Sequence, residues 1–284
     1  MAEDKTRGVR YPADMTPSAR LPLSGFVITK NEGARIEACL RSLADCAEIV
    51  VVDSGSTDDT RAVAERLAAE GLPIRWIENR WPGFAAQKQF ALEQCRQPWA
   101  VNLDADERLD SAIRAELPRL LDAPQSVAGW RIKRCDYLLG HGYPSRSAGE
   151  RPKLRLVRTG RAAYDLSQMV HEGLIPDGET PAAPRGAMLH FRILPLAEQM
   201  LKENAYSSLK AEQRGRAGKR KSPWRMVFSP LGYFLRLWLT RGYWRCGWAG
   251  FILSMNAAIY AFLTEAKTWE NAAVAARPPV DLVD

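Results

Sequence analysis

The sequence has few cysteines and histidines for its length, and their spacing excludes common metal and disulfide sites. Its 284 residues contain five cysteines and three histidines. No two cysteines form a C-x-x-C pair, and an odd number cannot all pair within one chain. We therefore expect reduced thiols in the protein core and a reducing compartment. The cysteines are Cys39, Cys46, Cys95, Cys135 and Cys246.

Two phosphate-binding signatures are also missing. A nucleotide-binding oxidoreductase on a Rossmann sheet needs G-x-G-x-x-G after its first strand, where this chain has Lys30-Asn31-Glu32-Gly33. The G-x-x-x-x-G-K motif of P-loop enzymes is absent as well. Both classes are thereby excluded as explanations of the pattern described below.

The first residues lack an apolar leader. Residues 1–20 are charged and contain Pro12 and Pro17, so we expect a flexible arm over residues 1–21 without an export signal. The remaining composition, 46% hydrophobic and 26% charged, is that of a globular protein. A formal net charge of +7 favours an anionic partner such as a nucleotide, an acidic lipid or an acidic sugar.

The first hundred residues alternate short apolar runs with helical periodicity. Runs of this length that end in turn residues predict buried strands, and strands alternating with helices predict a parallel α/β sheet. The expected strands are 23–29, 48–53, 74–78 and 99–103, and the expected helices are 35–44, about 58–70 and 83–95.

The pattern changes after about residue 125. Residues 129–133, 153–158 and 187–191 are expected to be strands, separated by long loops such as 137–149. Mixed strands and long loops suit a variable acceptor site. We accordingly predict one domain over 22–195, with a first half at 22–110 and a second half at 111–195.

Residues 196–284 are predicted to be a helical, basic and aromatic region. Ser229-Pro230 has the form of a helix N-cap followed by proline at the first helical position. Residues 246–263 carry no charge, but their bulky side chains fall on one helical face, which favours a packed or interfacial helix over a membrane span. Basic residues crowd 210–225, and cations beside aromatic helices predict contact with an anionic membrane through 210–263.

The fourth expected strand leads into three acids within four residues. Asp104 and Asp106 would point to one side of an extended backbone, at the carboxyl end of the sheet where open α/β proteins bind ligands. Two carboxylates there suit Mg²⁺ or Mn²⁺, which in turn hold phosphate oxygens. Taken alone, the motif also fits a solvated acidic turn.

Three segments together resemble a known family. Phe26–Glu32, Val51–Asp58 and Leu103–Glu107 are similar, in order and spacing, to the N-terminal half of family 2 glycosyltransferases with the GT-A fold. Trp81-Pro82-Gly83-Phe84 and Val170-His171-Glu172 resemble the subgroup that adds β-glucose to the lipopolysaccharide inner core. The implied fold is a Rossmann-like, nucleotide-binding, mostly parallel sheet with flanking helices. The resemblance implies that 22–195 is the glycosyltransferase domain, with its nucleotide-binding half at 22–110 and its acceptor-binding half at 111–195.

The resemblance implies a nucleotide-sugar donor, usually UDP-linked, and inversion at the anomeric carbon. Thr29, Asn31 and Glu32 would line the nucleotide pocket, Asp53 would contact the uracil or ribose, and Lys88 would lie near the nucleotide.

The same resemblance makes Asp104 and Asp106 the Asp-x-Asp pair, with Asp106 the more direct ligand of the divalent cation and a catalytic residue. A bound cation would neutralise charge on the departing diphosphate. His190 would complete the metal site, or it would be a hydrogen-bonded core histidine. His141, between two glycines, is expected to be a loop residue.

An acceptor hydroxyl needs a general base. Glu172 is the candidate that the resemblance implies, with Asp165 in reserve and a surface carboxylate as the alternative. Lys153, Arg155 and Arg158 either bind an acidic acceptor or form a solvated strand face.

The sequence thus predicts an inverting, metal-dependent glycosyltransferase that moves a hexose, glucose on the resemblance, from a UDP-linked donor to a lipopolysaccharide core saccharide. The expected location is the cytoplasmic face of the inner membrane of a Gram-negative bacterium. Transfer to a polyprenyl-linked or O-antigen or capsule intermediate is an alternative. A catalytically inactive, membrane-bound nucleotide-binding protein is an alternative from another class, and no nucleic-acid motif accompanies the basic stretch.

Overall fold

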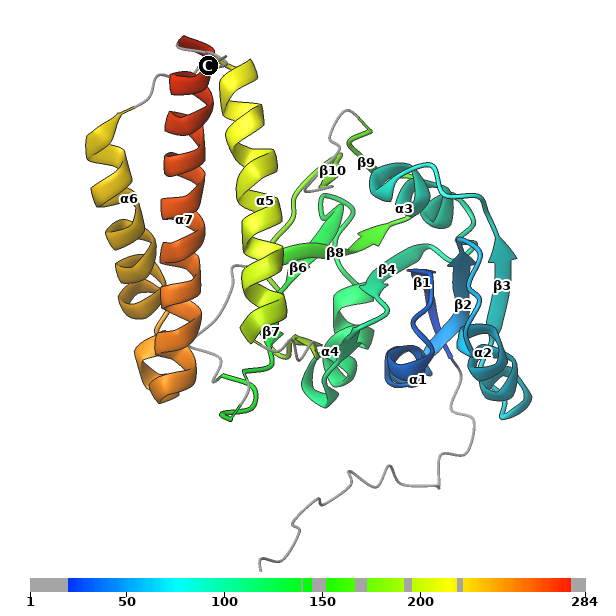
Figure 1. Ribbon diagram of the computed structural model, residues 1–284. Helices are drawn as coiled ribbons and strands as arrows, with labels where there is room; N and C mark the ends of the chain where they lie inside the picture. The colour runs from blue at the N-terminus through cyan, green and yellow to red at the C-terminus, as the bar shows by residue number, and fades with distance from the viewer. Residues whose placement is uncertain are drawn as a thin grey trace, which may run out of the picture. The chain divides into compact units, whose positions relative to one another are not determined.

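The computed structural model describes residues 20–138, 140–144, 152–166, 173–191, 196–218 and 222–276. Its first half alternates strands and helices, as predicted (Figure 1). The elements are β1 (Leu21–Thr29), α1 (Gly33–Ser42), β2 (Cys46–Asp53), α2 (Thr60–Ala69), β3 (Ile74–Glu78), α3 (Phe84–Glu93), β4 (Trp99–Asp104), β5 (Glu107–Leu109) and α4 (Ser111–Leu121).

The second half has short strands followed by long helices. These are β6 (Gly129–Ile132), β7 (Arg134–Asp136), β8 (Lys153–Arg158), β9 (Ala162–Tyr164), β10 (Leu174–Pro176), β11 (Met188–His190), α5 (Leu196–Arg216), α6 (Pro223–Leu235), the π-helix η1 (Arg236–Thr240), the 3-10 helix η2 (Tyr243–Cys246) and α7 (Gly247–Ala276). The predicted strands at 129–133, 153–158 and 187–191 are all present, shifted by one or two residues at most.

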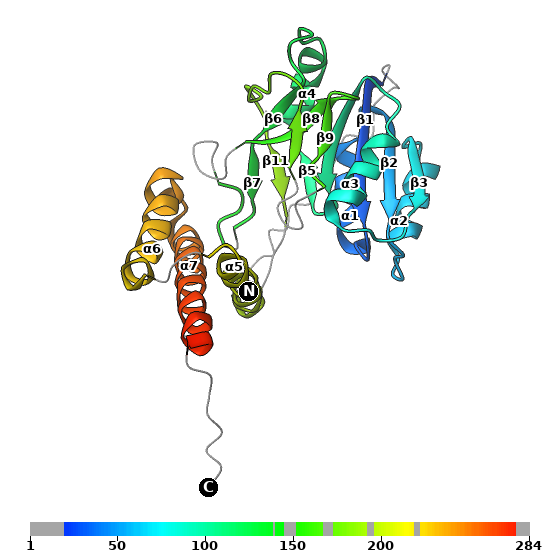
Figure 2. The ribbon, with the colours of Figure 1, turned by 90° about the horizontal axis from the view of Figure 1, so that it is seen from above.

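The main sheet has six strands in the order β3-β2-β1-β4-β8-β6. β1 pairs in parallel with β2 and β4, and β3 pairs in parallel with β2. β8 is antiparallel to β4. The central strands are apolar and buried on both faces, with helices α1, α2 and α3 alongside, as a parallel sheet requires (Figure 2). The expected α/β class with a mostly parallel sheet is confirmed.

Residue contacts divide the chain into two compact units. The first contains residues 1–104, 117–129 and 156–179, and the second contains 105–116, 130–155 and 180–284. The first unit holds β1 to β4 with α1 to α3. The second holds a small sheet ordered β5-β11-β7 and the helices α5, α6 and α7. The domain boundaries predicted from the sequence stay predictions.

Gly186 precedes β11 of the small sheet in the second unit and has an unusual backbone conformation. Gly186 has a φ of +78°, and a Cβ at this position would overlap the backbone of Ile113 at the start of α4. Only glycine permits both the left-handed backbone and this close approach. The next residues then form β11, which is antiparallel to β5 and parallel to β7.

Helix α6 of the second unit begins earlier than the sequence indicated, whereas α5 begins at Leu196 as predicted. The predicted N-cap at Ser229-Pro230 is wrong: Pro230 lies inside α6, which begins with Ser222 as N-cap and Pro223 at its first turn. The same serine–proline pattern occurs at both places, and the helix begins at the earlier one. α6 and α5 both pack against α7.

The bulk of α7 lies on one face, as predicted. Small residues such as Ala258 and Ala261 are buried against the neighbouring helices, whereas Trp248, Met255 and Phe262 are exposed. The segment Tyr243–Val274 is long and apolar enough to cross a membrane, although a third of its most apolar stretch is buried inside the second unit. The five cysteines are free and buried, in agreement with the expectation of reduced core thiols.

Candidate active site

Strand register in the first unit gathers three predicted residues at one edge of the sheet. Thr29 pairs with Asp53 across β1 and β2, and Ile28 pairs with Asp104 across β1 and β4. The carboxyl ends of parallel strands meet at this edge, where open α/β sheets bind ligands. The Thr29 hydroxyl is buried and has no hydrogen-bond partner in the described part of the chain. A buried donor of this kind is available to a ligand.

Asp53 is buried and organises the turn that follows β2. Its Oδ2 accepts hydrogen bonds from the backbone N–H groups of Gly55 (3.0 Å) and Ser56 (2.9 Å), and its Oδ1 accepts one from the Ser56 hydroxyl (2.5 Å). A carboxylate that bonds its own turn in this way fixes the loop geometry. The predicted contact with the nucleotide base or ribose remains a prediction, and the structure adds a loop-shaping role for this side chain.

The turn after β1 is tied to the turn after β2. Asn31 has a φ of +56°, and its Oδ1 accepts a hydrogen bond from the backbone N–H of Thr57 at 2.7 Å. The backbone N–H of Asn31 donates to the Ser56 hydroxyl at 2.9 Å. Glu32 forms an exposed ion pair with Arg35 at 2.8 Å. Asn31 therefore joins the two loops at this edge, and the predicted contact of Asn31 and Glu32 with a nucleotide stays a prediction.

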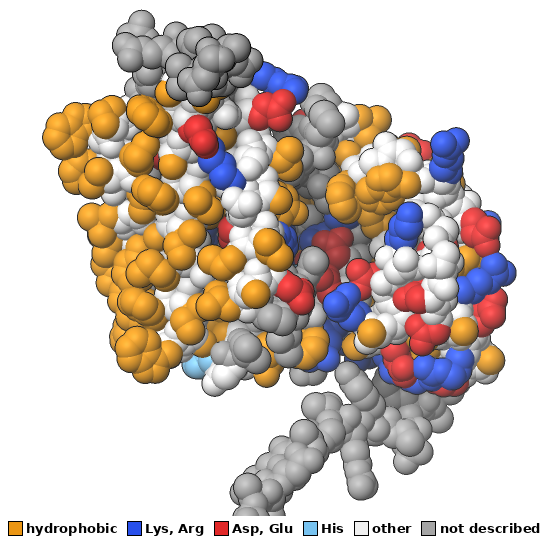
Figure 3. Space-filling model, in the orientation of Figure 1, with side chains coloured by type: hydrophobic (Ala, Val, Ile, Leu, Met, Phe, Trp, Pro, Cys, Tyr) orange, Lys and Arg blue, Asp and Glu red, His pale blue; other side chains and the backbone are white. Residues whose placement is uncertain are grey.

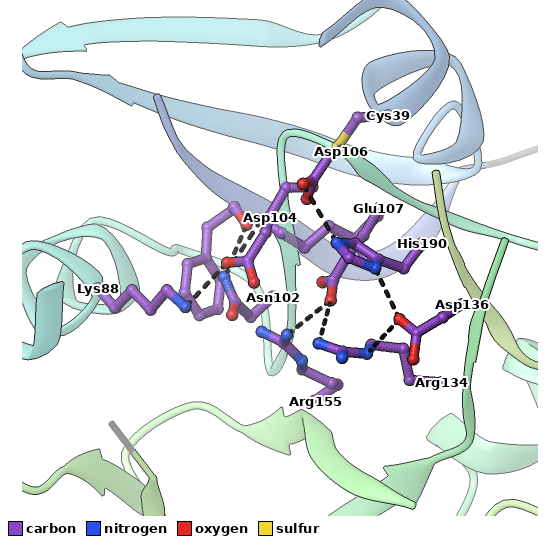
Figure 4. A network of polar contacts seen from close by, with 12 residues as sticks. Cys39, Lys88, Asn102, Asp104, Asp106, Glu107, Arg134, Asp136, Arg155 and His190 are labelled. Atoms are coloured by element: carbon purple, nitrogen blue, oxygen red, sulfur yellow. Dashed lines mark hydrogen bonds and ion pairs between the residues drawn. The ribbon is translucent and has the colours of Figure 1, made fainter. Parts of the chain in front are cut away.

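Lys88 extends from α3 to the end of β4. Its Nζ lies 2.8 Å from Oδ1 of Asp104, and only 5% of its side chain is exposed (Figure 4). The first unit thus presents a fixed cation at the strand edge, where a diphosphate would bring negative charge.

Asp106 does not continue the strand. The chain turns at Ala105-Asp106 between β4 and β5, so the expectation that both aspartates point from one extended backbone is wrong. A backbone turn breaks the alternation of side chains that the expectation used. Asp104 contacts Lys88 in the first unit, whereas Asp106 contacts His190 in the second. Only Ala105 separates them in the chain.

His190 lies between two carboxylates of the second unit. Its Nδ1 is 2.7 Å from Oδ1 of Asp136, and its Nε2 is 3.2 Å from Oδ2 of Asp106 (Figure 4). Pairing of β11 with β7 sets His190 opposite Asp136. Burial disfavours the charged imidazole, but hydrogen bonds to Asp106 and Asp136 outweigh that effect and raise the pKa of His190 to about 9.

Asp136 is held ionised in the same network. Burial of its carboxyl raises its pKa, but the hydrogen bond from His190 and the charge of Arg134 more than compensate, so the pKa of Asp136 is lowered overall. The Arg134 Nε lies 3.1 Å from Oδ1 of Asp136. Asp136 therefore orients the imidazole, and the sequence analysis did not identify it. Its signal was weak: a single acid at the end of a three-residue strand.

Glu107, the third acid of the motif, is a structural residue. Its side chain is fully buried, and its Oε1 lies 2.9 Å from Nη2 of Arg155 and 4.0 Å from Nη1 of Arg134 (Figure 4). β5 buries Glu107 and Leu109 and leaves Arg108 between them less buried, as strand alternation requires. The triple acid motif thus divides into three carboxylates with different partners.

Two of the three cations considered for an acidic acceptor have internal roles. Arg155 pairs with Glu107, and Arg158 lies 4.4 Å over the ring of Trp99 while donating to the carbonyl of Val127 at 3.0 Å. These two arginines do not form a solvated strand face, because their guanidinium groups contact the Glu107 carboxylate, the Trp99 ring and the Val127 carbonyl. Lys153 remains a candidate for contact with an acceptor.

The donor set at Asp106 and His190 suits a divalent cation in part. Ligands about 2.1–2.2 Å from an octahedral ion are about 3 Å apart, close to the 3.2 Å between Asp106 Oδ2 and His190 Nε2. Asp136 on Nδ1 supplies the outer hydrogen bond that metal-binding histidines have. Among the residues described, no group of three or more His, Cys, Asp or Glu side chains could complete a site alone. Mg²⁺ and Mn²⁺ sites commonly use one or two protein ligands plus substrate phosphates and water.

Several predicted residues have other outcomes. Glu172 and His171 lie outside the described residues. Asp165 is described and half-buried, and its backbone N–H donates to the carbonyl of Gly173 at 3.1 Å. His141 is exposed in a turn, as expected of a loop residue.

A mostly parallel sheet with acids and a lysine at the carboxyl ends of its strands is suited to binding a phosphate-bearing ligand. The chain belongs to glycosyltransferase family 2, since residues 24–171 match the family described as Glycosyl transferase family 2.

The chain is similar over most of its length to particular proteins. It is 53% identical over 262 residues to lipopolysaccharide core biosynthesis glycosyltransferase LpsC of Rhizobium meliloti (strain 1021), covering 92% of this chain and 97% of that protein. It is 30% identical over 259 residues to an uncharacterized glycosyltransferase of Rickettsia felis (strain ATCC VR-1525 / URRWXCal2), covering 88% and 90%. Among solved structures, mannosyltransferase PcManGT from Pyrobaculum calidifontis in complex with GDP-Man and Mn²⁺ has a TM-score of 0.49 at 17% identity, covering 96% of this chain and 81% of that one.

Proposed function

We propose that this family 2 glycosyltransferase transfers a hexose, glucose in our assignment, from a UDP-linked donor to a lipopolysaccharide core saccharide with inversion at the anomeric carbon. The observation that carries the acceptor assignment is the 53% identity to LpsC over 97% of that protein. The strand-edge carboxylates and Lys88 support a phosphate-bearing donor. Glucose, UDP and inversion rest on the resemblance to the inner-core subgroup.

Asp106 and His190 would hold a divalent cation, which supplies electrostatic stabilisation of the departing diphosphate when bound. Asp136 fixes the imidazole so that Nε2 faces Asp106. At the strand edge of the first unit, Lys88 supplies a positive charge for a phosphate and keeps Asp104 in place. Buried cations add to stabilisation because the low local dielectric strengthens each interaction.

The acceptor hydroxyl loses a proton as it attacks the sugar. Glu172 is our assigned base, on the resemblance alone, and Asp165 is the second candidate. Glu172→Gln would keep the shape of the side chain while removing its basicity. A large fall in kcat with little change in the KM for the donor supports the assignment, and unchanged kcat transfers it to Asp165.

The reaction is tested with the full-length protein, a panel of UDP- and GDP-linked hexoses, Mn²⁺ and purified lipopolysaccharide core acceptors. Asp106→Ala is expected to abolish transfer, and Asp177→Ala, an 89% exposed aspartate, serves as the control. Transfer by Asp106→Ala at the wild-type rate would refute the metal role. Transfer only to polyprenyl-linked intermediates would move the acceptor to that class, and absence of any turnover would favour an inactive nucleotide-binding protein.

We also propose that the second unit binds the surface of an anionic membrane. α6 has no buried residue, and the exposed aromatic and aliphatic side chains of α6, η1 and α7 form a continuous apolar surface, here called the aromatic face (Figure 3). Its largest members are Trp224, Phe228, Leu231, Leu239 and Trp248. An exposed patch of this size marks an interaction surface.

Charge favours a bilayer over a protein partner. The chain carries a net charge of +7, and Arg245 in η2 lies beside the helices of the aromatic face. Each cation near an anionic surface adds about 1 kcal/mol to binding. Part of the basic stretch at 210–225 acts internally, because Arg214 and Arg225 pair with Glu265 at 2.7 and 3.4 Å. The proposed location is the cytoplasmic face of a Gram-negative inner membrane.

Co-sedimentation with vesicles of phosphatidylglycerol and phosphatidylethanolamine tests this surface. Trp248→Ser together with Phe228→Ser is expected to reduce binding at least tenfold, and Trp81→Ser, an exposed tryptophan on the first unit, should not. Binding that is unaffected by the double substitution refutes the proposal. A concentration-dependent dimer that the double variant abolishes assigns the face to a second copy of the chain instead.

A further inference from the structure

A cavity of about 480 Å³ lies within the second unit. Its walls come from β7, the start of β8, and helices α5, α6, η1, η2 and α7. The volume is in the range of small-molecule sites. All lining residues belong to one compact unit, so the cavity is a property of that unit alone.

The polar lining is that of a site for an acidic sugar. Three cations, Lys153, Arg236 and Arg241, line the cavity with two acids, Asp136 and Glu203. Cations of this kind recognise carboxylate and phosphate groups. Burial raises the pKa of Glu203, and the three cations outnumber the two acids. The balance of charge in the cavity is therefore positive.

Uncharged groups add hydrogen-bonding and ring surfaces. Asn256 and Gln199 both line the cavity and are paired side chain to side chain at 2.8 Å. Amides held in this way present further donors and acceptors at fixed positions, as recognition of sugar hydroxyls requires. The rings of Tyr233, Tyr243 and Tyr260 supply apolar faces with polar hydroxyls.

The backbone is irregular where the cavity takes its arginines. Arg236 begins the π-helix η1, and the backbone N–H of Arg241 donates to the carbonyl of Arg236 at 3.0 Å. Gly242 follows with a φ of +70°. Short π-helical segments are rare and are often found at functional sites. Here the departure from α-geometry brings two arginines five residues apart to one cavity.

The cavity adjoins the candidate active site through Asp136. This residue lines the cavity and also accepts the hydrogen bond of His190 Nδ1 at 2.7 Å, while His190 Nε2 faces Asp106 at 3.2 Å. All three residues belong to the second unit. A sugar that contacts Asp136 in the cavity would consequently be linked to the Asp106 carboxylate through the His190 imidazole.

The same helix relates the cavity to the aromatic face. On α7, Leu253, Asn256 and Tyr260 line the cavity, whereas Trp248 and Met255 are exposed. At about 100° per residue the mean directions of these two sets differ by about 120°, so the two sets lie on different faces of the helix. One side of α7 is therefore suited to a saccharide and the other to lipid.

We propose that this cavity binds the anionic sugar of the acceptor, a saccharide bearing a carboxylate or phosphate, while the aromatic face contacts the membrane that holds its lipid. This inference rests on the proposed function and adds the acceptor subsite. Arg236 and Arg241 would contact the anion, with Lys153 as a third cation.

The test compares two forms of one probe, de-O-acylated lipopolysaccharide core oligosaccharide, either native or with its phosphates removed and carboxyl groups reduced. The wild type should use and bind the native form more tightly. Arg236→Gln with Arg241→Gln should raise the acceptor KM about 10- to 100-fold, leave the donor KM unchanged and remove the preference between the two forms. Arg216→Gln, an exposed arginine of α5, is the control, because it removes charge elsewhere in the unit.

The outcomes separate the two proposals. If the wild type transfers sugar to the native core but the double variant matches Arg216→Gln, the cavity is not the acceptor site. If the wild type uses no lipopolysaccharide core, the proposed function fails. Calorimetric binding of the native oligosaccharide to wild type and variant then still tests the cavity. Lys153→Gln provides an independent variant if the double substitution impairs folding, and equal binding by this variant and wild type would count against the inference.

Discussion

Replacing Glu107 with glutamine tests whether the last acid of the Asp-Ala-Asp-Glu motif stabilises the fold. The Glu107 side chain is fully buried, and that of Arg155 is 9% exposed, with Oε1 and Nη2 2.9 Å apart. Glutamine keeps the size of the side chain but leaves the Arg155 charge buried without its counter-ion. Removing one partner of a buried ion pair lowers the free energy of unfolding by about 3–5 kcal/mol.

The matched control is an ion pair of similar length on the surface. Glu65 lies 2.8 Å from Arg61, with side chains 63% and 57% exposed. Exposed pairs contribute about 0–1 kcal/mol. Glu65→Gln should therefore change stability little, although it removes the same charge at nearly the same distance.

Urea unfolding followed by circular dichroism measures the difference. With an m value of about 2–3 kcal/mol/M, Glu107→Gln should lower the unfolding midpoint by about 1–2 M. Because the chain has two compact units, hydrogen exchange at β5, β7 and β11 should show that the loss is in the second unit. Glu107→Leu combined with Arg155→Met should lower stability less than Glu107→Gln, since no buried charge is then left without a counter-ion.

Two results would refute this reasoning. One is an equal, small effect of Glu107→Gln and Glu65→Gln, which would mean that burial does not govern the pair. The other is a loss of stability in the double variant Glu107→Leu, Arg155→Met that equals the sum of the losses in Glu107→Leu and Arg155→Met alone. The effects of two residues in direct contact should not add in this way.

Three further predictions concern the candidate site. In the metal-free protein, the His190 imidazole should titrate near pH 9 by NMR, and Asp136→Asn should lower that pKa by more than one unit; a value near 6.5 in both proteins would contradict the network. The folded-state pKa of His190 is raised, so its stabilisation, on the order of 3 kcal/mol, is complete below pH about 6.5 and is lost as pH rises through about 9, which thermal unfolding against pH would measure. Asp136→Asn should also weaken Mn²⁺ binding about 10- to 100-fold, read from metal-induced thermal stabilisation, and unchanged Mn²⁺ affinity would exclude a positioning role.

Lys88 has one predicted role, near the nucleotide, and one observed contact, with Asp104. Its residue type and position beside the nucleotide followed from the resemblance, whereas its pairing with Asp104 came from the structure. Periodicity places α3 and β4 as elements, but it does not define how far a lysine on one reaches across to the other. That distance depends on how the helix packs on the sheet.

The sequence by itself determined the order of strands and helices over residues 21–104, because apolar runs of strand length alternate with helical periodicity there. It also determined that Thr29, Asp53 and Asp104 share one edge, because the carboxyl ends of parallel strands coincide. Only the tertiary structure decided that Asp104, Asp106 and Glu107 have three different partners. Those partners, Lys88, His190 and Arg155, lie 16, 84 and 48 residues away in the chain. No local pattern encodes contacts at such separations, because they depend on packing and on one backbone turn at Ala105-Asp106.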